Sequence, residues 1–125
     1  MRGLLTLKEL STTQIEEIIK YAIELKNGKQ VSYPGKKMAT LFYENSTRTH
    51  YSFQVALMNL GIQVLCCDVS KSSVQKGETL YDTVRTFESI GVDGVIIRSS
   101  VDEYYKELET IKIPIFNGGD GKSNH

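Results

Sequence analysis

Hydroxyl, amide and basic side chains gather in four segments of the chain, and each segment follows a short apolar run. Basic side chains beside hydroxyl and amide donors form the combination that binds a phosphate or a carboxylate. The four segments therefore predict a site for a small anion if the fold brings them together. In chain order they contain Ser46, Thr47, Arg48 and Thr49, then Ser72 and Lys76, then Arg98, and finally Asn117, Gly118, Gly119 and His125.

The first segment is the most informative, because it reads ENSTRT and passes directly into a helical pattern. Ser46 or Thr47 can cap this helix. The first backbone N–H groups and the helix dipole favour an anion at that point, and Arg48 adds a planar donor suited to phosphate. The chain has neither a GxxxxGK[S/T] loop nor a GxGxxG motif after this strand, so no nucleoside-triphosphate loop and no dinucleotide fingerprint are predicted.

The elements that would position these segments alternate between helix and strand. Apolar spacing predicts helices over 11–28, 47–61, 79–91 and 100–109, and apolar runs predict strands over 38–43, 62–67, 94–98 and 113–117. Ser11 with Gln14, and Ser100 with Glu103, have the spacing of capping boxes. The alternation implies an α/β fold with three layers, α/β/α, around a four-stranded parallel sheet. Such sheets bind ligands at the carboxyl ends of their strands, where the four segments lie.

Composition and charge exclude several other classes of function. Lys plus Arg and Asp plus Glu are both 15, so the formal net charge is zero, which argues against nucleic-acid and membrane-surface partners. No stretch reaches the roughly 20 apolar residues that cross a bilayer. Cys66 and Cys67 are the two cysteines, and neighbours in a strand point to opposite faces. We therefore expect reduced, mostly buried thiols in a cytoplasmic protein, and no metal site.

Three motifs resemble those of the aspartate/ornithine carbamoyltransferase family. FYENSTRTHYSF resembles its Ser-Thr-Arg-Thr signature, and GGDGKSNH resembles the segment that leads into its His-Pro-Thr-Gln motif. SSVQKGETLYDT resembles a loop of the aspartate carbamoyltransferase catalytic chain, with Ser72 and Lys76 in an arrangement that the ornithine branch does not usually carry. The resemblance covers essentially the whole chain, and it implies the N-terminal, carbamoyl-phosphate-binding half of such an enzyme.

The resemblance also implies a reaction and a set of residue roles. The reaction is transfer of the carbamoyl group from carbamoyl phosphate to the amino group of L-aspartate, the first committed step of de novo pyrimidine biosynthesis. The Ser-Thr-Arg-Thr motif would hold the phosphate, and Thr49, Arg98 and His125 would face the carbamoyl oxygen. Ser72 and Lys76 would reach the site of a neighbouring subunit, because the family's catalytic unit is a homotrimer with shared sites. The implied catalytic residues are Arg48, Thr49, Lys76, Arg98 and His125, and Ser46, Thr47 and Ser72 complete the carbamoyl-phosphate site.

Two neighbours of the motif receive no catalytic role. We expect His50 on the helix surface, and Glu44 either orients Arg48 by an ion pair or is simply exposed. Negative charge builds on the carbonyl oxygen and on the departing phosphate during the reaction. Fixed cationic and amide donors can stabilise both charges, so we expect no metal, no cofactor and no covalent nucleophile.

The resemblance further implies a longer protein than these 125 residues. Residues 1–125 are expected to form the carbamoyl-phosphate-binding domain, truncated at its C-terminal end, without the aspartate-binding domain. We therefore expect this chain alone to be inactive. Two other hypotheses stay open: a carbamoyltransferase acting on ornithine or another amine, and a non-catalytic phosphate-binding domain. The sequence does not decide whether regulatory chains associate.

Overall fold

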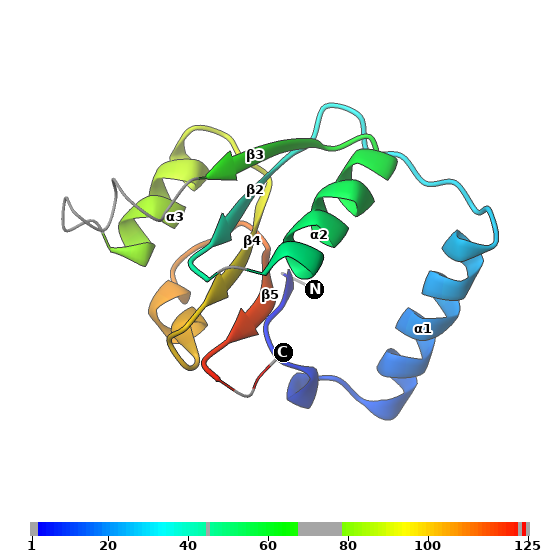
Figure 1. Ribbon diagram of the computed structural model, residues 1–125, viewed down its shortest axis with the longest axis horizontal. Coiled ribbons are helices and arrows are strands. Elements are labelled where there is room, and N and C mark those ends of the chain that lie inside the picture. Colours follow the sequence, from blue (N-terminus) through cyan, green and yellow to red (C-terminus); the bar gives the residue numbers. More distant parts are fainter. Residues whose placement is uncertain (1–2, 45, 68–78, 123, 125) are drawn as a thin grey trace.

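Five strands form one sheet in the computed structural model, which describes residues 3–44, 46–67, 79–122 and 124 (Figure 1). Their spatial order is β1-β5-β4-β2-β3, and every neighbouring pair is parallel. The strands are β1 (Gly3–Leu4), β2 (Lys37–Phe42), β3 (Gln63–Cys67), β4 (Gly94–Ser99) and β5 (Ile115–Asp120). The helices are η1 (Leu7–Glu9), α1 (Thr12–Lys26), α2 (Thr47–Asn59), α3 (Leu80–Ser89) and η2 (Tyr104–Leu108), where η marks a 3₁₀ helix.

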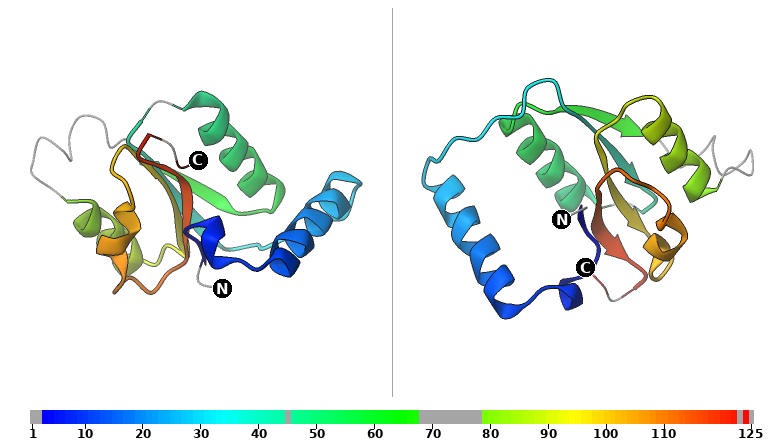
Figure 2. Two further views of the ribbon diagram at one scale, coloured as in Figure 1. Left: turned by 90° about the horizontal axis from the view of Figure 1, so that it is seen from below. Right: turned by 180° about the vertical axis from the view of Figure 1, so that it is seen from behind.

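Helices cover both faces of this sheet, as Figure 2 shows from below. α2 packs on one face against Met38, Ile96 and partly buried aromatic side chains. α3 and η2 cover the other face, where the larger apolar cluster includes Leu41, Ile97 and Tyr104. Apolar strands buried on both faces are typical of parallel sheets, since each crossover lays a helix on the sheet. The predicted three-layer α/β fold is confirmed.

The structure differs from the prediction at three elements. β1 adds a fifth strand, which has only two residues in register with Ile115 and Phe116 and is therefore too short to show as an apolar run. The predicted capping box at Ser100 is absent: η2 begins after Glu103, which has a left-handed φ of 51° and makes no side-chain cap. The last strand begins at Ile115 and continues through Asp120, so the glycines after Asn117 belong to the strand.

The first helix has the predicted capping box, in which Ser11 and Gln14 exchange hydrogen bonds. None of its residues is buried, and Figures 1 and 2 show α1 standing apart from the sheet. The expectation of mostly buried thiols is wrong, because Cys66 is exposed and Cys67 is half-buried. Both lie on β3, an edge strand, which has a neighbouring strand on one side only. Within the part of the chain that the structure describes, no helix has the length and apolar content needed to span a membrane.

Candidate functional site

The carboxyl ends of β2, β4 and β5 lie side by side. Phe42 on β2 is in register with Arg98 on β4, and the amide of Tyr43 donates to the Arg98 carbonyl at 2.9 Å. Ile97 on β4 is in register with Asn117 on β5. The fold thus brings three of the four predicted segments to one edge of the sheet, because parallel strands all end on the same side.

The loop after β2 delivers the hydroxyl and basic residues to the start of α2. Ser46 occupies the N-cap position, but its side chain makes no capping hydrogen bond, whereas α1 and α3 both begin with complete capping boxes. Thr47 and Arg48 are exposed, and Ser46 and Thr49 are half-buried. The predicted capping role of this Ser-Thr pair is therefore not seen. A helix start without a side-chain cap presents its N-terminal amides and positive dipole end to whatever lies in front of it.

Arg98 is held from two sides at the end of β4. Its Nε lies 3.7 Å from a carboxylate oxygen of Glu44, and its Nη1 donates to the carbonyl of Gly118 at 3.1 Å. The side chain is 19% exposed, and among the described residues the buried Nε has no hydrogen-bond partner. Glu44 therefore pairs with Arg98. In the part of the chain that the structure describes it neither orients Arg48 nor stands free in solvent, so neither of the two alternatives for this carboxylate holds. The guanidinium is fixed in place while part of its donor capacity is unused.

The backbone of Gly118 and Gly119 packs against this guanidinium. Gly119 has φ +131°, a conformation that other residues rarely adopt. A Cβ at this position would lie 2.8 Å from Nη1 of Arg98 and 3.2 Å from its Cζ. Glycine is thus required at position 119 both for the backbone conformation and for the space that the guanidinium occupies.

The half-buried Asn117 and the buried Asp120 form a polar hub beside these glycines, and the sequence did not predict it. Asp120 is 2% exposed and accepts hydrogen bonds from the Glu103 amide at 2.7 Å and from the carboxamides of Asn117 and Asn124. Burial raises the pKa of this carboxyl, but the three N–H donors outweigh burial and leave the pKa below its ordinary value. Asp120 is therefore a carboxylate at neutral pH. In the sequence, Asp120 ends the stretch NGGD, and this pattern predicts a glycine-rich loop, not a buried carboxylate.

The hub extends to a buried tyrosine on the opposite face of the sheet from α2. The Tyr104 hydroxyl lies 2.8 Å from the Ile97 carbonyl and 3.0 Å from Oδ1 of Asn117, and it can donate to either. Burial, with the nearby charge of Asp120, raises the pKa of Tyr104 far above its ordinary value. The hydroxyl thus stays protonated and serves as a donor within the hub.

His50 is not the surface residue that we expected. Its ring stacks on Phe42 at 4.3 Å between centroids, and its Nε2 lies 3.2 Å from the hydroxyl of Thr40 and 3.0 Å from Nε2 of Gln54. The Sγ of Cys66 is 3.4 Å from the same nitrogen. The ring therefore packs between α2 and the sheet, and these contacts give it a structural role.

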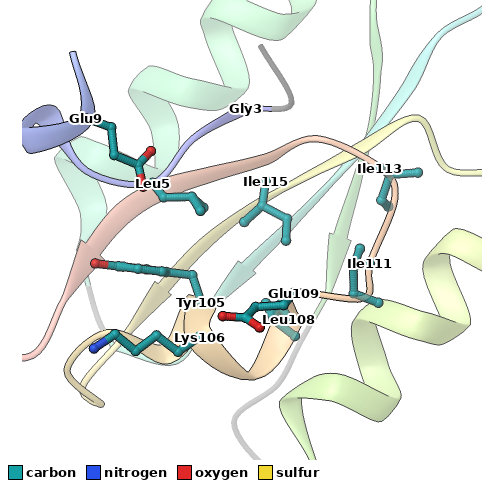
Figure 3. Close-up of a pocket in the computed structure, with 10 residues that line it drawn as sticks. All are labelled: Gly3, Leu5, Glu9, Tyr105, Lys106, Leu108, Glu109, Ile111, Ile113 and Ile115. Carbon is teal, nitrogen blue, oxygen red and sulfur yellow. The ribbon is translucent and has the colours of Figure 1, made fainter. Parts of the chain in front are cut away.

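The remaining predicted site residues, Ser72, Lys76 and His125, lie outside the described residues. Among the residues that are described, no group of three or more His, Cys, Asp and Glu side chains could hold a metal ion. A hollow of about 440 Å³ lies elsewhere, between β1, η2 and the start of β5 (Figure 3). Its floor is apolar, with Leu5, Leu108 and Ile115, and it contains none of the predicted site residues. This hollow is therefore separate from the strand ends that carry the candidate anion site.

Fold and strand-end geometry together define a parallel α/β domain with a candidate site for an anionic ligand. The chain belongs to the aspartate/ornithine carbamoyltransferase family, because the family model described as its carbamoyl-P binding domain matches residues 2–125. This finding confirms the resemblance seen in the three motifs. The aspartate carbamoyltransferase catalytic subunit of Staphylococcus carnosus (strain TM300) is 48% identical over 126 residues, which cover all of this chain and 42% of that relative.

Solved structures of an aspartate transcarbamoylase from Trypanosoma cruzi are similar in fold. The complex with aspartate and phosphate aligns with a TM-score of 0.83 at 33% identity, over 95% of this chain and 40% of that one. The complex with carbamoyl phosphate aligns with a TM-score of 0.82, also at 33% identity and over the same shares of the two chains. The chain therefore spans about two fifths of the length of the relatives it matches.

Proposed function

We propose that this chain is the carbamoyl-phosphate half of an aspartate carbamoyltransferase. The observation that carries the proposal is that Arg98 lies at the end of β4, in register with the end of β2, and that the chain after β2 leads to a start of α2 where the Ser46 side chain makes no cap. The chain also belongs to this family. Further support comes from the relative that is 48% identical and named an aspartate carbamoyltransferase catalytic subunit. Its substrates would be carbamoyl phosphate and L-aspartate, and a cytoplasmic location fits such a biosynthetic enzyme.

The reaction would use this edge of the sheet for positioning and for charge stabilisation. Ser46, Thr47, Arg48 and the first amides of α2 would hold the phosphate. Thr49, Arg98 and His125 would stabilise the carbamoyl oxygen, while Ser72 and Lys76 would arrive from a neighbouring subunit. The amine attacks the carbamoyl carbon, the bond from that carbon to the phosphate oxygen breaks, and the nitrogen loses a proton. Donors fixed in a site from which water is excluded stabilise the developing charges most strongly.

A direct assay of the longer protein would test the proposal. The protein should contain residues 1–125 and the continuation that its relatives have, and it would be supplied with carbamoyl phosphate and either L-aspartate or ornithine. We expect carbamoyl-aspartate and phosphate in equal amounts, with no product from ornithine. Product from ornithine alone would assign the chain to the other branch of the family. Saturable carbamoyl-phosphate binding without any product would favour a non-catalytic domain.

The outer side of α2 supports the proposed homotrimer. Tyr51, Val55 and Met58 recur at helical spacing and are 59%, 54% and 68% exposed, next to the edge strand β3. A contiguous apolar stripe on a helix commonly marks a protein–protein contact. If the stripe forms the subunit interface, Met58→Asp places a charge in it, and we expect the trimer to dissociate. Light scattering would report a fall from trimer to monomer mass.

A matched control for this substitution is Ile90→Asp. Ile90 is 66% exposed at the end of α3, away from the α2 stripe. We expect Ile90→Asp to remain trimeric and active, and Met58→Asp to lose activity together with its assembly, because the sites are shared between subunits. A trimer that survives Met58→Asp would place the interface on another surface.

A further inference from the structure

Glu44 is the charged partner of Arg98 in the described part of the chain, but its carboxylate lies 3.7 Å from Nε, beyond hydrogen-bond distance, so shorter contacts must set the direction of the guanidinium. The hydrogen bond to the Gly118 carbonyl and the close approach to Gly119 are the contacts that do so. Arg98 therefore points where the Gly118–Gly119 backbone allows it to point. A glycine pair does not set its own conformation, because glycine tolerates most backbone angles.

Asn117 and Asp120 flank these two glycines and fix their conformation. Oδ1 of Asn117 accepts from the Gly119 amide at 2.9 Å, and its Nδ2 donates to Asp120 at 2.7 Å and to the Leu5 carbonyl at 2.9 Å. With Tyr104 as a second donor in reach of Oδ1, the hydrogen-bonding capacity of this carboxamide is fully used. The Asn117 side chain is therefore fixed, and the Gly119 backbone is fixed with it.

Asp120 anchors the other end of the glycine pair. Its carboxylate binds the Glu103 amide, and its own amide donates to the Asn124 carbonyl at 2.9 Å. A buried carboxylate that accepts three N–H groups is costly to disturb, because any lost donor leaves a charge without compensation. Three parts of the chain are thereby joined around Gly118 and Gly119: the loop before η2, the end of β5 and Asn124.

We propose that Asn117 and Asp120 are positioning residues for Arg98. They hold the Gly118–Gly119 backbone, and this backbone directs the Arg98 guanidinium toward the carbamoyl-phosphate site. The inference rests on the proposed function, because it concerns the direction of a group assigned to the carbamoyl oxygen. It goes beyond that function by assigning a role to side chains that do not contact the substrate. Misplacing a catalytic group by an ångström can cost about 100-fold in rate.

Kinetics of the full-length enzyme would test the pair through Asp120→Asn, a change that keeps the size of the side chain and removes its charge. We expect kcat to fall about 30-fold. The Kd for inorganic phosphate should change by less than about threefold, since the phosphate-binding motif lies at the N-cap and in the first turn of α2. The matched control is Asp93→Asn. Asp93 also accepts a backbone amide, that of Lys37 at 2.9 Å, but at the amino-terminal edge of the sheet. We expect its kcat to stay within about twofold of wild type.

A double-mutant cycle separates positioning from a merely structural role. If Asp120 acts through Arg98, then adding Asp120→Asn to Arg98→Ala should change kcat by less than about twofold, because coupled residues are not additive. The full loss of kcat on top of Arg98→Ala would overturn the inference. A wild-type kcat in Asp120→Asn, together with a reduced kcat in Arg98→Ala, would also overturn the inference. The proposed function would not be affected by that result. A wild-type protein without carbamoyl transfer would overturn both.

A second variant keeps the test valid where Asp120→Asn does not fold. Gly119→Ala leaves the hub intact and places a Cβ 2.8 Å from Nη1 of Arg98. We expect the same signature: a fall in kcat of about 30-fold, an almost unchanged Kd for inorganic phosphate, and no further loss in the Arg98→Ala background. Wild-type kcat in a folded Gly119→Ala enzyme would overturn the proposed control of Arg98 by this backbone.

Discussion

Arg48→Ala is expected to lower kcat/KM for carbamoyl transfer by about 10³-fold in the full-length protein, which corresponds to about 4 kcal/mol of transition-state stabilisation. Arg48 is exposed in the first turn of α2, two residues after Ser46, whose side chain makes no capping hydrogen bond. A guanidinium at this point adds a bidentate donor to the partial positive charge of the helix start. The departing phosphate gains charge during the reaction, so losing the guanidinium should cost more in the transition state than in the ground state.

Calorimetric titration with carbamoyl phosphate should be measured together with the kinetics. We expect saturable binding by the wild-type protein and a loss of measurable binding by Arg48→Ala. The matched control is Arg85→Ala, which removes an exposed arginine of α3 that pairs with Glu88 at 2.9 Å. Arg85 is exposed and distant from the candidate site, so its loss costs at most about 1 kcal/mol of stability. We expect binding and rate to be unchanged. Equal affinities of Arg48→Ala and wild type would remove Arg48 from the phosphate site.

The sequence predicts the fold class and the edge of the sheet that carries the site, and both follow from short-range patterns. Apolar runs alternate with helical spacing, and this alternation alone implies a parallel sheet with its functional residues at the strand ends. Arg98 could be placed there because it directly follows the apolar run of β4. The partner of Glu44 could not be predicted, since its contact with Arg98 depends on the pairing of β2 with β4.

The polar hub escaped prediction because the contacts that tie it to the rest of the fold are distant in sequence. Asn117 binds the carbonyl of Leu5, 112 residues away, and Asp120 binds the amide of Glu103, 17 residues away. Local patterns carry no information on such pairs. The two glycines between Asn117 and Asp120 also indicated a loop, whereas the structure continues β5 through them.

His50 shows a different limit of prediction. Its polar type suggested the helix surface, but its position three residues before Phe53 and seven before Leu57 places it on the same face as those buried or partly buried residues. Helical spacing was thus the better guide than residue type. The ring is accommodated because Thr40 and Gln54 supply hydrogen-bonding groups where α2 meets the sheet.

Leu41→Ala is expected to have the largest effect on stability. The Leu41 side chain is completely buried on the interior strand β2, in the cluster shared with α3 and η2. Removing a buried leucine side chain costs about 2–5 kcal/mol, because transfer free energy is lost and a cavity remains. A domain of this size unfolds with a total of about 5–15 kcal/mol. Urea unfolding followed by circular dichroism should therefore show a much lower midpoint with an unchanged slope.

Leu65→Ala is the matched control, because it makes the same chemical change on the same face of the sheet. Leu65 lies on the edge strand β3, opposite Ala39, and is 36% exposed, so it has less apolar contact to lose. We expect a loss of about 1 kcal/mol for this variant. Equal losses of unfolding free energy at the two positions would mean that Leu65 is covered as completely as Leu41. This would be the case if β3 were enclosed in the subunit interface proposed beside it. Repeating the two measurements on a dissociated Met58→Asp background would then restore the difference, because the isolated domain exposes that edge.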